Sequence, residues 1–416
     1  MRVLLISSNT ERINMVTLPL GLGFVAAATR RAGHEVSVVD ALREPDPVLA
    51  IQRSIAAFEP NVIGISVRNI DDQARDAPRF LLAQVQPLVE ACRASSHAPI
   101  VLGGAGFSVF PEAALRYLGA DLGVQGDGEV VFPELLRRLE EGKDPHGLPG
   151  VHVRGRNPGP EPSFSERLDS LPQWDEALQA AADPAASELW VPVQTRRGCP
   201  NDCSYCATAH IQGRRIRIRP VGEVADHVAR LADLGYRRLY FVDNSFNIPE
   251  PYALDLCGAL RRCGAGLEWR CILYPQDLRE ELAAAMAEAG CVEVSLGFES
   301  GSLPVLREMG KRFTPEDVRD VSDRLSAHGI RRMGFLLLGG PGETRETVEE
   351  SLAFAASLRL DALRVTVGIR IYPGTKLARR AVAEGLIGPD DDLLLPRFYL
   401  ASGLEPWIHD RVAALR

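Results

Sequence analysis

Three cysteines lie within eight positions of one another in the segment RRGCPNDCSYCATAH, residues 196–210. They are Cys199, Cys203 and Cys206, and the whole chain of 416 residues has only 8 cysteines. Closely spaced thiolates bind metal ions or iron–sulfur clusters. Two kinds of site are therefore open. One is a structural zinc site that adds the His210 imidazole to the three thiolates, and the other is a four-iron cluster whose fourth iron stays free to bind another molecule.

The surroundings of these thiols favour the cluster. Zinc knuckles usually staple small domains that lack a hydrophobic core, whereas the cysteines here follow a strand candidate, LWVPVQT (residues 189–195). In β/α barrels the active-site loops lie at the carboxyl ends of the strands. We therefore expect a [4Fe–4S] cluster on the three cysteines, with His210 not a ligand.

The strand before the cysteines is the first of six strand candidates. The others are RRLYFVD (237–243), LEWRCI (267–272), VEVSLGF (292–298), RMGFLLLG (332–339) and ALRVTVGIRIY (362–372). Helical stretches separate them, and this alternation predicts parallel β/α units. Because an eight-fold barrel needs about 250 residues, we expect a partial (β/α)6 barrel over residues 188–375, closed by a tail over residues 376–416.

Residues 1–144 alternate in the same way. Their strand candidates are RVLLIS (2–7), EVSVVD (35–40), NVIGIS (61–66), PIVLGG (99–104) and ADLGVQ (120–125). Strands joined by helical crossovers pair in parallel and build an open, doubly wound sheet, and ligands of such sheets lie outside the carboxyl ends of the strands. Residues 145–187 are rich in proline, glycine and polar side chains, so we expect a linker between two α/β domains.

The composition disfavours several classes of partner. With 47 basic and 55 acidic residues the formal net charge is −8, which argues against a nucleic-acid surface. The basic run GRRIRIR (213–219) is either a solvated edge strand or a patch that steers anionic ligands. No apolar run approaches the roughly 18 residues of a membrane span, and the N-terminal sequence has no signal-peptide core. We therefore expect a cytoplasmic protein, in which thiols stay reduced.

With Tyr205 directly before the last cysteine, the thiol pattern resembles the signature of the radical S-adenosylmethionine enzymes. The resemblance extends from Leu189 to about Thr375. It implies that the three cysteines hold a [4Fe–4S] cluster whose open iron chelates S-adenosylmethionine (SAM). One electron from the cluster, supplied by a donor such as flavodoxin or ferredoxin, then cleaves SAM to a 5′-deoxyadenosyl radical.

Segments at the ends of three later strands resemble the SAM-binding segments of the same family. They are FVDNSFN (241–247), VSLGFESG (294–301) and GFLLLGGPGET (334–344). The first stands where the family often carries a Gly-Gly-Glu strand that meets the methionine amino group, so an aspartate and an asparagine would do that work here. The residues that the resemblance assigns to SAM are Tyr205, Asp243, Asn244, Ser295, Glu299, Gly340 and Pro341.

Glycine-rich segments mark the carboxyl edge of the N-terminal sheet, and they resemble the cobalamin-binding domain found in front of many radical SAM enzymes. Glycines let a backbone approach a large flat ligand closely. After the first strand the chain reads SSNTERINM, without a histidine, so the resemblance implies cobalamin with no protein histidine on cobalt. The candidate cobalamin-binding residues are Leu20, Gly21, Ser66, Arg68, Asn69, Gly103, Gly104, Gly106, Gly128 and Glu129.

Together the two resemblances imply an enzyme that methylates an unactivated carbon. Cobalamin would carry a methyl group from one SAM molecule to a substrate radical, which a deoxyadenosyl radical from a second SAM molecule would create. The ligand edges of the two domains should then face each other across the linker. Two alternatives stay open: radical cyclisation or rearrangement without methyl transfer, and a non-catalytic cobalamin- or zinc-binding protein.

The substrate is expected to be a small molecule or a lipid intermediate, because no further segment resembles a peptide-recognition or second-cluster domain. Arg370 and Tyr372, in the segment IRIYPGT at the end of the sixth strand, are candidates for holding the substrate or shuttling a proton. Packing of the barrel explains both residues equally well.

Overall fold

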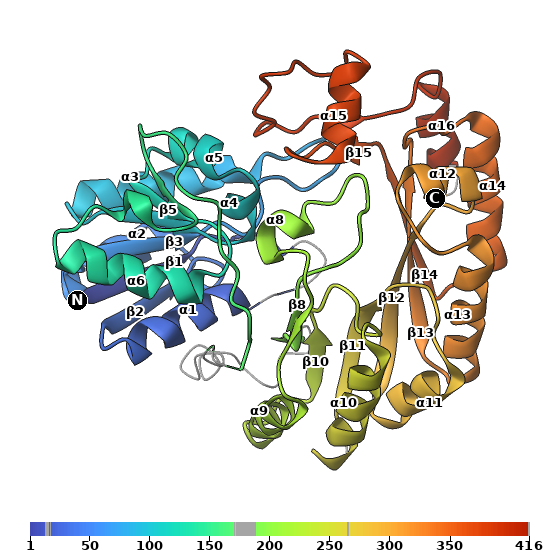
Figure 1. The fold of residues 1–416 in the computed structure, drawn as a ribbon, viewed down its shortest axis with the longest axis horizontal. Coiled ribbons are helices and arrows are strands. Elements are labelled where there is room, and N and C mark those ends of the chain that lie inside the picture. The colour runs from blue at the N-terminus through green and yellow to red at the C-terminus, as the bar shows by residue number, and fades with distance from the viewer. Residues whose placement is uncertain (13–15, 17, 170, 172–188, 264–265, 415–416) are drawn as a thin grey trace. The chain divides into compact units, whose positions relative to one another are not determined.

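The chain divides into two units, each with its own parallel sheet (Figure 1). The structure is a computed structural model and describes residues 1–12, 16, 18–169, 171, 189–263 and 266–414. Unit 1 comprises Met1–Asp72, Pro78–Asp183 and Ala207–Gly213. Unit 2 comprises Gln73–Ala77, Pro184–Cys206 and Arg214–Arg416.

Unit 1 is built on a six-stranded sheet with the order β2-β1-β3-β4-β5-β6. The strands are β1 (Arg2–Ser7), β2 (Glu35–Asp40), β3 (Val62–Ser66), β4 (Ile100–Gly103), β5 (Leu122–Val124) and β6 (Val151–Val153). The first five pair in parallel, and β6 adds an antiparallel edge. The strand order reverses at β1, so the predicted doubly wound sheet is confirmed.

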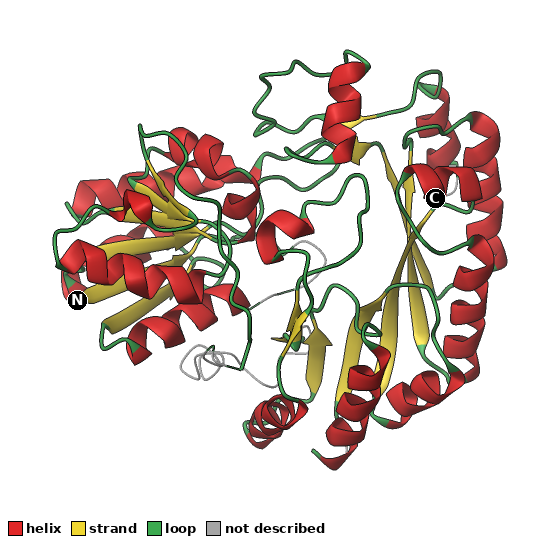
Figure 2. Cartoon of the chain, in the orientation of Figure 1, coloured by secondary structure: helices red, strands yellow, loops and turns green. Residues whose placement is uncertain are grey.

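Helices cover both faces of this sheet (Figure 2). They are α1 (Leu20–Arg31), α2 (Pro47–Phe58), α3 (Gln86–Ser95), α4 (Ala105–Val109), α5 (Pro111–Leu118) and α6 (Gly128–Glu140), with the 3-10 turns η1 (Leu81–Val85) and η2 (Pro145–Gly147). α1 packs beside α6, and α2 packs beside α3. Burial of strands on both faces explains why their sequences read as short continuous apolar runs.

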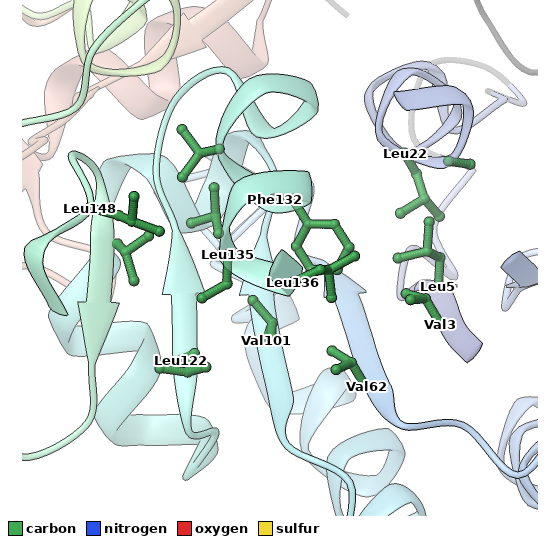
Figure 3. Packing of buried hydrophobic residues seen from close by; sticks show 14 residues of the cluster. Val3, Leu5, Leu22, Val62, Val101, Leu122, Phe132, Leu135, Leu136 and Leu148 are labelled. Atoms are coloured by element: carbon green, nitrogen blue, oxygen red, sulfur yellow. The ribbon is translucent and has the colours of Figure 1, made fainter. Parts of the chain in front are cut away.

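One hydrophobic core lies between the sheet and the α1–α6 face, as Figure 3 shows. Phe132, Leu135 and Leu136 project from α6 onto the strands. The members drawn and labelled are Val3, Leu5, Leu22, Val62, Val101, Leu122, Phe132, Leu135, Leu136 and Leu148. Leu148 lies in the segment that the sequence places in the linker, so the ordered part of unit 1 continues beyond residue 144.

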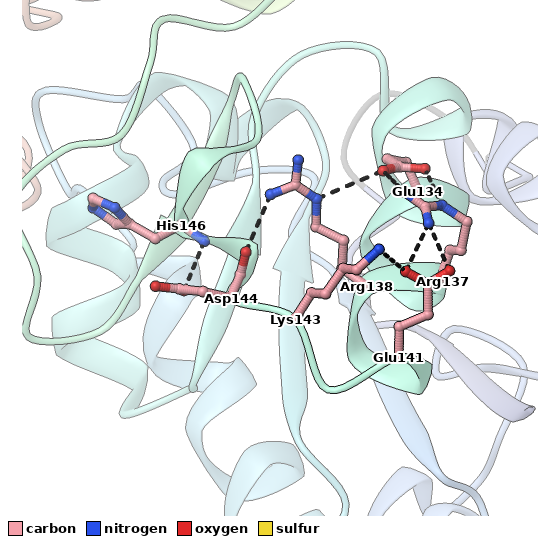
Figure 4. Close-up of polar contacts among 7 residues, drawn as sticks. All are labelled: Glu134, Arg137, Arg138, Glu141, Lys143, Asp144 and His146. Carbon is pink, nitrogen blue, oxygen red and sulfur yellow. Dashed lines mark hydrogen bonds and ion pairs between the residues drawn. The ribbon is translucent and has the colours of Figure 1, made fainter.

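The turn after α6 is lined by exposed ion pairs (Figure 4). Arg137 contacts Glu134 at 2.6 Å and Glu141 at 2.7 Å, while Asp144 accepts a bond from the backbone N–H of His146 at 3.1 Å. Exposed pairs of this kind contribute little to stability, because water screens them. They shape the turn that leads into η2 and β6, whereas the apolar cluster stabilises the unit.

Unit 2 is built on six parallel strands in the consecutive order β14-β13-β12-β11-β10-β7. They are β7 (Val191–Val193), β10 (Arg238–Phe241), β11 (Glu268–Leu273), β12 (Cys291–Glu299), β13 (Arg331–Leu338) and β14 (Ala362–Val367). Each strand pairs with its predecessor in this order, as barrel strands do, and β7 is not paired with β14. The predicted partial barrel is confirmed.

The connecting helices lie on one side of this curved sheet (Figure 2). They are α9 (Val221–Asp233), α10 (Glu250–Arg262), α11 (Glu280–Glu288), α12 (Leu303–Glu308), α13 (Pro315–Ala327) and α14 (Arg345–Ser357). Burial alternates along the strands: Leu296 and Phe298 of β12 are fully buried, while Ser295, Gly297 and Glu299 are half-buried. Because alternate side chains point to opposite faces, the half-buried set faces the concave side, away from the helices.

Short elements complete the chain. They are the antiparallel pair β8 (Arg196–Arg197) and β9 (Arg217–Ile218), the pair β15 (Ile369–Arg370) and β16 (Phe398–Tyr399), and the helices α8 (Thr208–Gln212), α15 (Lys376–Ala383) and α16 (Trp407–Ala413). Among the described residues, no helix combines the length and apolar character required to cross a bilayer.

The structure departs from the sequence expectations in the basic run 213–219. Arg214 and Arg215 are exposed, as in a solvated strand, but Arg217 and Arg219 are buried and Ile218 is exposed. Arg217 lies on β9, which pairs with β8. β8 ends just before the loop that carries the three cysteines, called the cluster loop below. The run is therefore part of the framework around that loop.

The predicted strand 362–372 is interrupted at Gly368. This glycine has a φ of +79° and separates β14 from β15. A Cβ atom there would lie 2.5 Å from Cδ of Arg75. A φ of +79° is not an extended conformation, so the strand ends at this glycine. The nearby Arg75, from a distant part of the sequence, leaves little room for a side chain at this position.

Candidate active site

The three cysteines lie on the loop that joins β8 to α8. Cys199 and Cys203 are half-buried and Cys206 is exposed, and none of them forms a disulfide. The backbone N–H of Ser204 donates to Met309 O at 2.9 Å, and the N–H of Leu377 donates to Ser204 O at 2.8 Å. The loop is therefore held between the end of α12 and the start of α15.

The donor set of this loop fits an iron–sulfur cluster, since it offers three reduced thiols from one short segment. Burial raises the pKa of the Cys199 and Cys203 thiols, and the nearby Lys311 ammonium opposes that shift for both. Within the described ranges, no three His, Cys, Asp or Glu side chains are grouped to hold a single metal ion. A cluster does not require such a group, because each thiolate binds a different iron.

A buried polar cluster adjoins the cysteines, formed by Tyr205, Glu299 and Lys311. The Tyr205 hydroxyl donates to Glu299 Oε1 at 2.9 Å, and Lys311 Nζ donates to the same oxygen at 3.2 Å. Lys311 Nζ also lies 5.4 Å from the centre of the Tyr205 ring. The sequence indicates the tyrosine and the glutamate but not Lys311, because no local pattern marks a lysine that becomes buried only through the fold.

Glu299 has a backbone conformation that suits a functional position. Its φ is +62°, in the left-handed region that few residues other than glycine adopt. The register between β12 and β13 shifts between Gly297 and Glu299, so the carboxylate lies at a bulge at the end of the strand. Strained conformations of this kind persist where surrounding contacts enforce them, often at ligand sites.

Burial and neighbouring charges shift the pKa values of Tyr205 and Lys311. Burial raises the pKa of the Tyr205 phenol well above its ordinary value, and the Glu299 carboxylate adds to that rise. Burial alone would lower the pKa of Lys311, but Tyr205 and Glu299 outweigh it and hold that pKa well above its usual value. The lysine is therefore a fixed positive charge at neutral pH, and the tyrosine is a neutral donor.

Asp243, which the family resemblance assigns to the methionine amino group of SAM, has a different environment from the one expected. Its side chain is buried, Oδ1 accepts from the backbone N–H groups of Thr195 and Arg196 at 2.8 and 3.1 Å, and Oδ2 accepts from Thr195 Oγ1 and Arg196 Nε. Both oxygens are thus used to join the ends of β7 and β10. The neighbouring Asn244 is half-buried and donates to Gly198 O at 3.3 Å, which leaves it beside the cluster loop.

The fifth-strand segment is organised by a residue that no sequence pattern indicates, Glu343. Its Oε2 accepts from the backbone N–H groups of Gly339 and Gly340, the latter at 2.9 Å. Pro341 is buried, and Gly339 has a φ of +92°. Burial raises the pKa of Glu343 to about 7. Gly340 and Pro341, which the resemblance assigns to SAM, are therefore part of a turn held from within by this carboxyl group.

Arg370 and Tyr372 are the sequence candidates for contact with the substrate. Arg370 is buried and donates to the carbonyl oxygens of Ile371, Leu393 and Leu394 at 2.6, 2.8 and 3.4 Å. It therefore anchors the C-terminal loop, and its role toward the substrate stays a prediction. Its guanidinium carbon lies 5.3 Å from the centre of the Tyr372 ring, and Tyr372 is half-buried.

In unit 1 the candidate cobalamin residues lie at the carboxyl edge of the parallel strands. Two of them, Gly104 and Gly106, pack against the chain itself, since a Cβ atom would meet Val67 O at 2.6 Å and Arg68 O at 3.0 Å, respectively. The structure places the ten candidates at the end of β3, the end of β4 and the starts of α1, α4 and α6: Leu20, Gly21, Ser66, Arg68, Asn69, Gly103, Gly104, Gly106, Gly128 and Glu129.

Open backbone at this edge fits a flat ligand. A Cβ atom on Gly21 would meet nothing within 4 Å, and one on Gly103 would meet only Val124 O at 3.7 Å. Gly103 is the last residue of β4, and Gly21 is the second residue of α1. Glycines with free space at the ligand edge of a doubly wound sheet let a cofactor approach the backbone. Residues 8–19, which follow β1, contain no histidine.

Two family models match the chain. The Radical SAM superfamily matches residues 193–355, and the B12 binding domain matches residues 7–136. The first range contains the loop with the three cysteines and the polar group of Tyr205, Glu299 and Lys311. The second range contains the glycine-rich edge of unit 1. The chain is therefore a radical SAM enzyme with an N-terminal B12-binding domain.

Relatives narrow this class. The uncharacterized methyltransferase PH0819 of Pyrococcus horikoshii is 29% identical over 400 residues, covering 93% of this chain and 84% of that protein. The tryptophan 2-C-methyltransferase of Streptomyces laurentii is 26% identical over 440 residues, covering 89% and 73%. The structure of TsrM, a radical SAM methyltransferase from Kitasatospora setae with cobalamin and a [4Fe–4S] cluster bound, has a TM-score of 0.80 at 25% identity, covering 92% and 75%.

The chain belongs to the cobalamin-dependent radical SAM methyltransferases, and its cofactors are a [4Fe–4S] cluster, SAM and cobalamin. The fold class and the cofactors expected from the sequence are confirmed. The non-catalytic alternative is set aside, since the chain is an enzyme of this family.

Proposed function

We propose that the protein transfers a methyl group from SAM to an unactivated carbon of a small molecule or a lipid intermediate. The observation that carries this proposal is the cluster loop joined to Tyr205, Glu299 and Lys311 on a partial barrel, in a chain that also has a B12-binding domain. When bound, the cluster with SAM supplies a radical that removes hydrogen from an sp³ carbon, and cobalamin supplies a methyl carrier.

The chain's own residues bind and orient these groups. Cys199, Cys203 and Cys206 hold the cluster, while Ser295 and Glu299 lie on the half-buried, concave side of the barrel, where they would bind the polar part of SAM. The Glu299 carboxylate is already oriented before any ligand binds, because its Oε1 accepts hydrogen bonds from both Tyr205 and Lys311. Such pre-orientation lowers the cost of binding a charged ligand.

The adenine end and the cobalamin end of the site are shaped by backbone. The Gly339–Pro341 turn, fixed by Glu343, would lie beside the adenine. Gly21 and Gly103 would lie against the corrin, and no histidine after β1 would reach cobalt. For methyl transfer the two ligand edges should face one substrate, and a flavodoxin- or ferredoxin-like donor should supply the electron.

The test follows the methyl carbon. The anaerobically reconstituted full-length protein is incubated with methyl-¹³C SAM, a one-electron reductant and small-molecule or lipid extracts, and products are separated by mass spectrometry. We expect one labelled product, with 5′-deoxyadenosine and S-adenosylhomocysteine formed in near-equal amounts. The variants Cys199→Ala, Cys203→Ala and Cys206→Ala should abolish deoxyadenosine, whereas His210→Ala should not.

Two results would contradict the proposal. Deoxyadenosine with a rearranged but unlabelled product would assign the chain to radical cyclisation or rearrangement. Zinc without iron in the purified protein would contradict the cluster on the three cysteines.

A further inference from the structure

Lysine is rare in this chain. Only three of its 47 basic residues are lysines: Lys143, Lys311 and Lys376. The side chains of Lys143 and Lys376 are 62% and 53% exposed, as is usual for lysine, whereas that of Lys311 is only 6% exposed. Burying an ammonium group costs several kcal/mol before any contact is made, so this position needs a physical explanation.

The backbone before Lys311 packs directly on the cluster loop. A Cβ atom on Gly310, whose φ is +73°, would lie 2.6 Å from Asp202 O and 3.5 Å from Cys203 Cα. One residue earlier, Met309 O accepts from the N–H of Ser204. The lysine is thus placed beside the thiols by two adjoining contacts, and the glycine is required because a side chain would separate the two segments.

The ammonium group of Lys311 is held in a defined position. It donates to Glu299 Oε1 at 3.2 Å and lies 5.4 and 5.6 Å from the ring centres of Tyr205 and Phe313. Aromatic faces attract a desolvated cation. Replacing a buried ion pair by apolar residues is often neutral or stabilising, so stability alone does not account for a charge at this place.

We propose that Lys311 is a positioning residue whose buried charge raises the reduction potential of the [4Fe–4S] cluster. The inference rests on the proposed function in one respect, the assignment of the cluster to Cys199, Cys203 and Cys206. Reduction adds one electron, and hence one negative charge, to a group already bound by three thiolates. A fixed cation in a low-dielectric environment stabilises that added charge, and nearby charge is one of the factors that sets the potentials of such clusters.

Glu299 carries a negative charge, so its removal tests independently whether the reduction potential shifts in the expected direction. Removing the Lys311 charge leaves the carboxylate unopposed beside the thiolates and should make reduction harder. Removing the Glu299 charge leaves the ammonium unopposed and should make reduction easier. A residue with only a packing role would not shift the potential in opposite directions in these two variants.

The experiment is an anaerobic redox titration of the reconstituted full-length protein, with the reduced cluster followed by electron paramagnetic resonance. For Lys311→Met we expect the equilibrium constant for one-electron reduction to fall about tenfold, which corresponds to 59 mV. Lys311→Arg should stay near the wild type. Lys376→Met is the matched control: it removes an exposed charge that is paired with Asp202 of the same loop, and water should screen it.

Iron and sulfide counts accompany each titration. A Lys311→Met variant with full cluster content and the wild-type potential would overturn the inference. Where that variant does not retain its cluster, Glu299→Gln decides: a raised potential supports the inference, and an unchanged or lowered one overturns it. Absence of iron from the wild type would instead contradict the cluster assignment, so the two failures are distinguishable.

Discussion

A single buried carboxyl group, that of Glu343, holds the turn after β13. Its Oε2 accepts two backbone bonds inside the Gly339–Gly342 turn, while its buried Oε1 has no partner among the described residues. Burial raises the pKa of this group to about 7. An unpaired buried carboxylate oxygen is costly when ionised, so protonation of Glu343 should stabilise the Gly339–Gly342 turn.

This carboxyl group predicts a pH dependence of stability. Because its pKa is higher in the folded state than the ordinary value of 4.5, the folded protein holds the proton more tightly. Its contribution is then fully present below about pH 4.5 and is lost as the pH rises through 7. We expect Glu343→Gln to remove this loss, on the order of 3 kcal/mol, in denaturant unfolding of unit 2 at pH 5 and pH 8. Glu346→Gln, on the exposed first turn of α14, should not change the dependence.

The limits of sequence reasoning at this scale follow from what local patterns encode. The spacing of Cys199, Cys203 and Cys206 is itself the chemical requirement, so the sequence alone is enough to predict their role. Lys311 and Glu343 matter because the fold buries them, and nothing in their sequence neighbourhood indicates that burial. Asp243 and Arg370 have the right type and position for a ligand contact, but their hydrogen bonds connect elements of the protein.

At the scale of elements, close backbone contact explains why Gly104 is a glycine. Its φ is +96°, and a Cβ atom would lie 2.6 Å from Val67 O and 2.9 Å from Ser66 Oγ. The turn between β4 and α4 therefore packs on the end of β3. Of the two neighbouring candidates for cobalamin contact, Gly103 leaves space for a ligand, whereas Gly104 already contacts the chain.

Two alanine substitutions separate these roles. Gly104→Ala should destabilise unit 1 by about 1–3 kcal/mol, since it forces a side chain into the left-handed region and into a carbonyl oxygen. Gly103→Ala should change stability little, because its Cβ would make only ordinary contact at 3.7 Å. Denaturant unfolding of the two variants measures the difference. Equal stabilities would show that the β3–β4 contact relaxes at no cost.

Most elements are predictable because periodicity and burial agree. The six barrel strands and the five parallel strands of unit 1 occur where short apolar runs are bounded by turn residues. The exceptions depend on tertiary contact. β6 forms inside a segment with linker composition, where it pairs with the edge strand β5. The strand after residue 362 ends at Gly368, whose φ is +79° and whose neighbour Arg75 comes from a distant part of the sequence. Residue 170 and residues 172–187 of the predicted linker lie outside the described residues.

At the scale of the whole molecule, the two units are not consecutive in the sequence. Gln73–Ala77 belongs to unit 2, although the residues on both sides of it belong to unit 1, and Ala207–Gly213 belongs to unit 1 although it follows the cluster loop of unit 2. The chain therefore passes between the units several times. The division at residues 144 and 188 expected from composition leaves β6 in the linker and does not include these exchanged segments.

The segment 73–77 is anchored in unit 2 mainly by one side chain. Arg75 donates to both oxygens of Glu405 at 2.8 and 2.9 Å, and its Nη1 lies 2.7 Å from Nε2 of His409. Because a guanidinium has no acceptor, Nε2 must accept, and Nδ1 is left to donate to Asp76 at 3.0 Å. Arg75 also fills the space over Gly368, so it joins the segment to α16 and to the end of β14 together.

Loss of these contacts should loosen the segment locally. We expect Arg75→Ala to speed amide hydrogen exchange in residues 73–77 at least tenfold, because the variant removes the bidentate pair, the histidine bond and the packing on Gly368 at once. Glu405→Ala should have a smaller effect, since Arg75 keeps His409 and its packing. Arg79→Ala is the control: Arg79 is more exposed than Arg75 but also forms ion pairs, and its partners Asp72 and Glu11 lie in unit 1. Unchanged exchange in Arg75→Ala would mean that the backbone, rather than this side chain, holds the segment in unit 2.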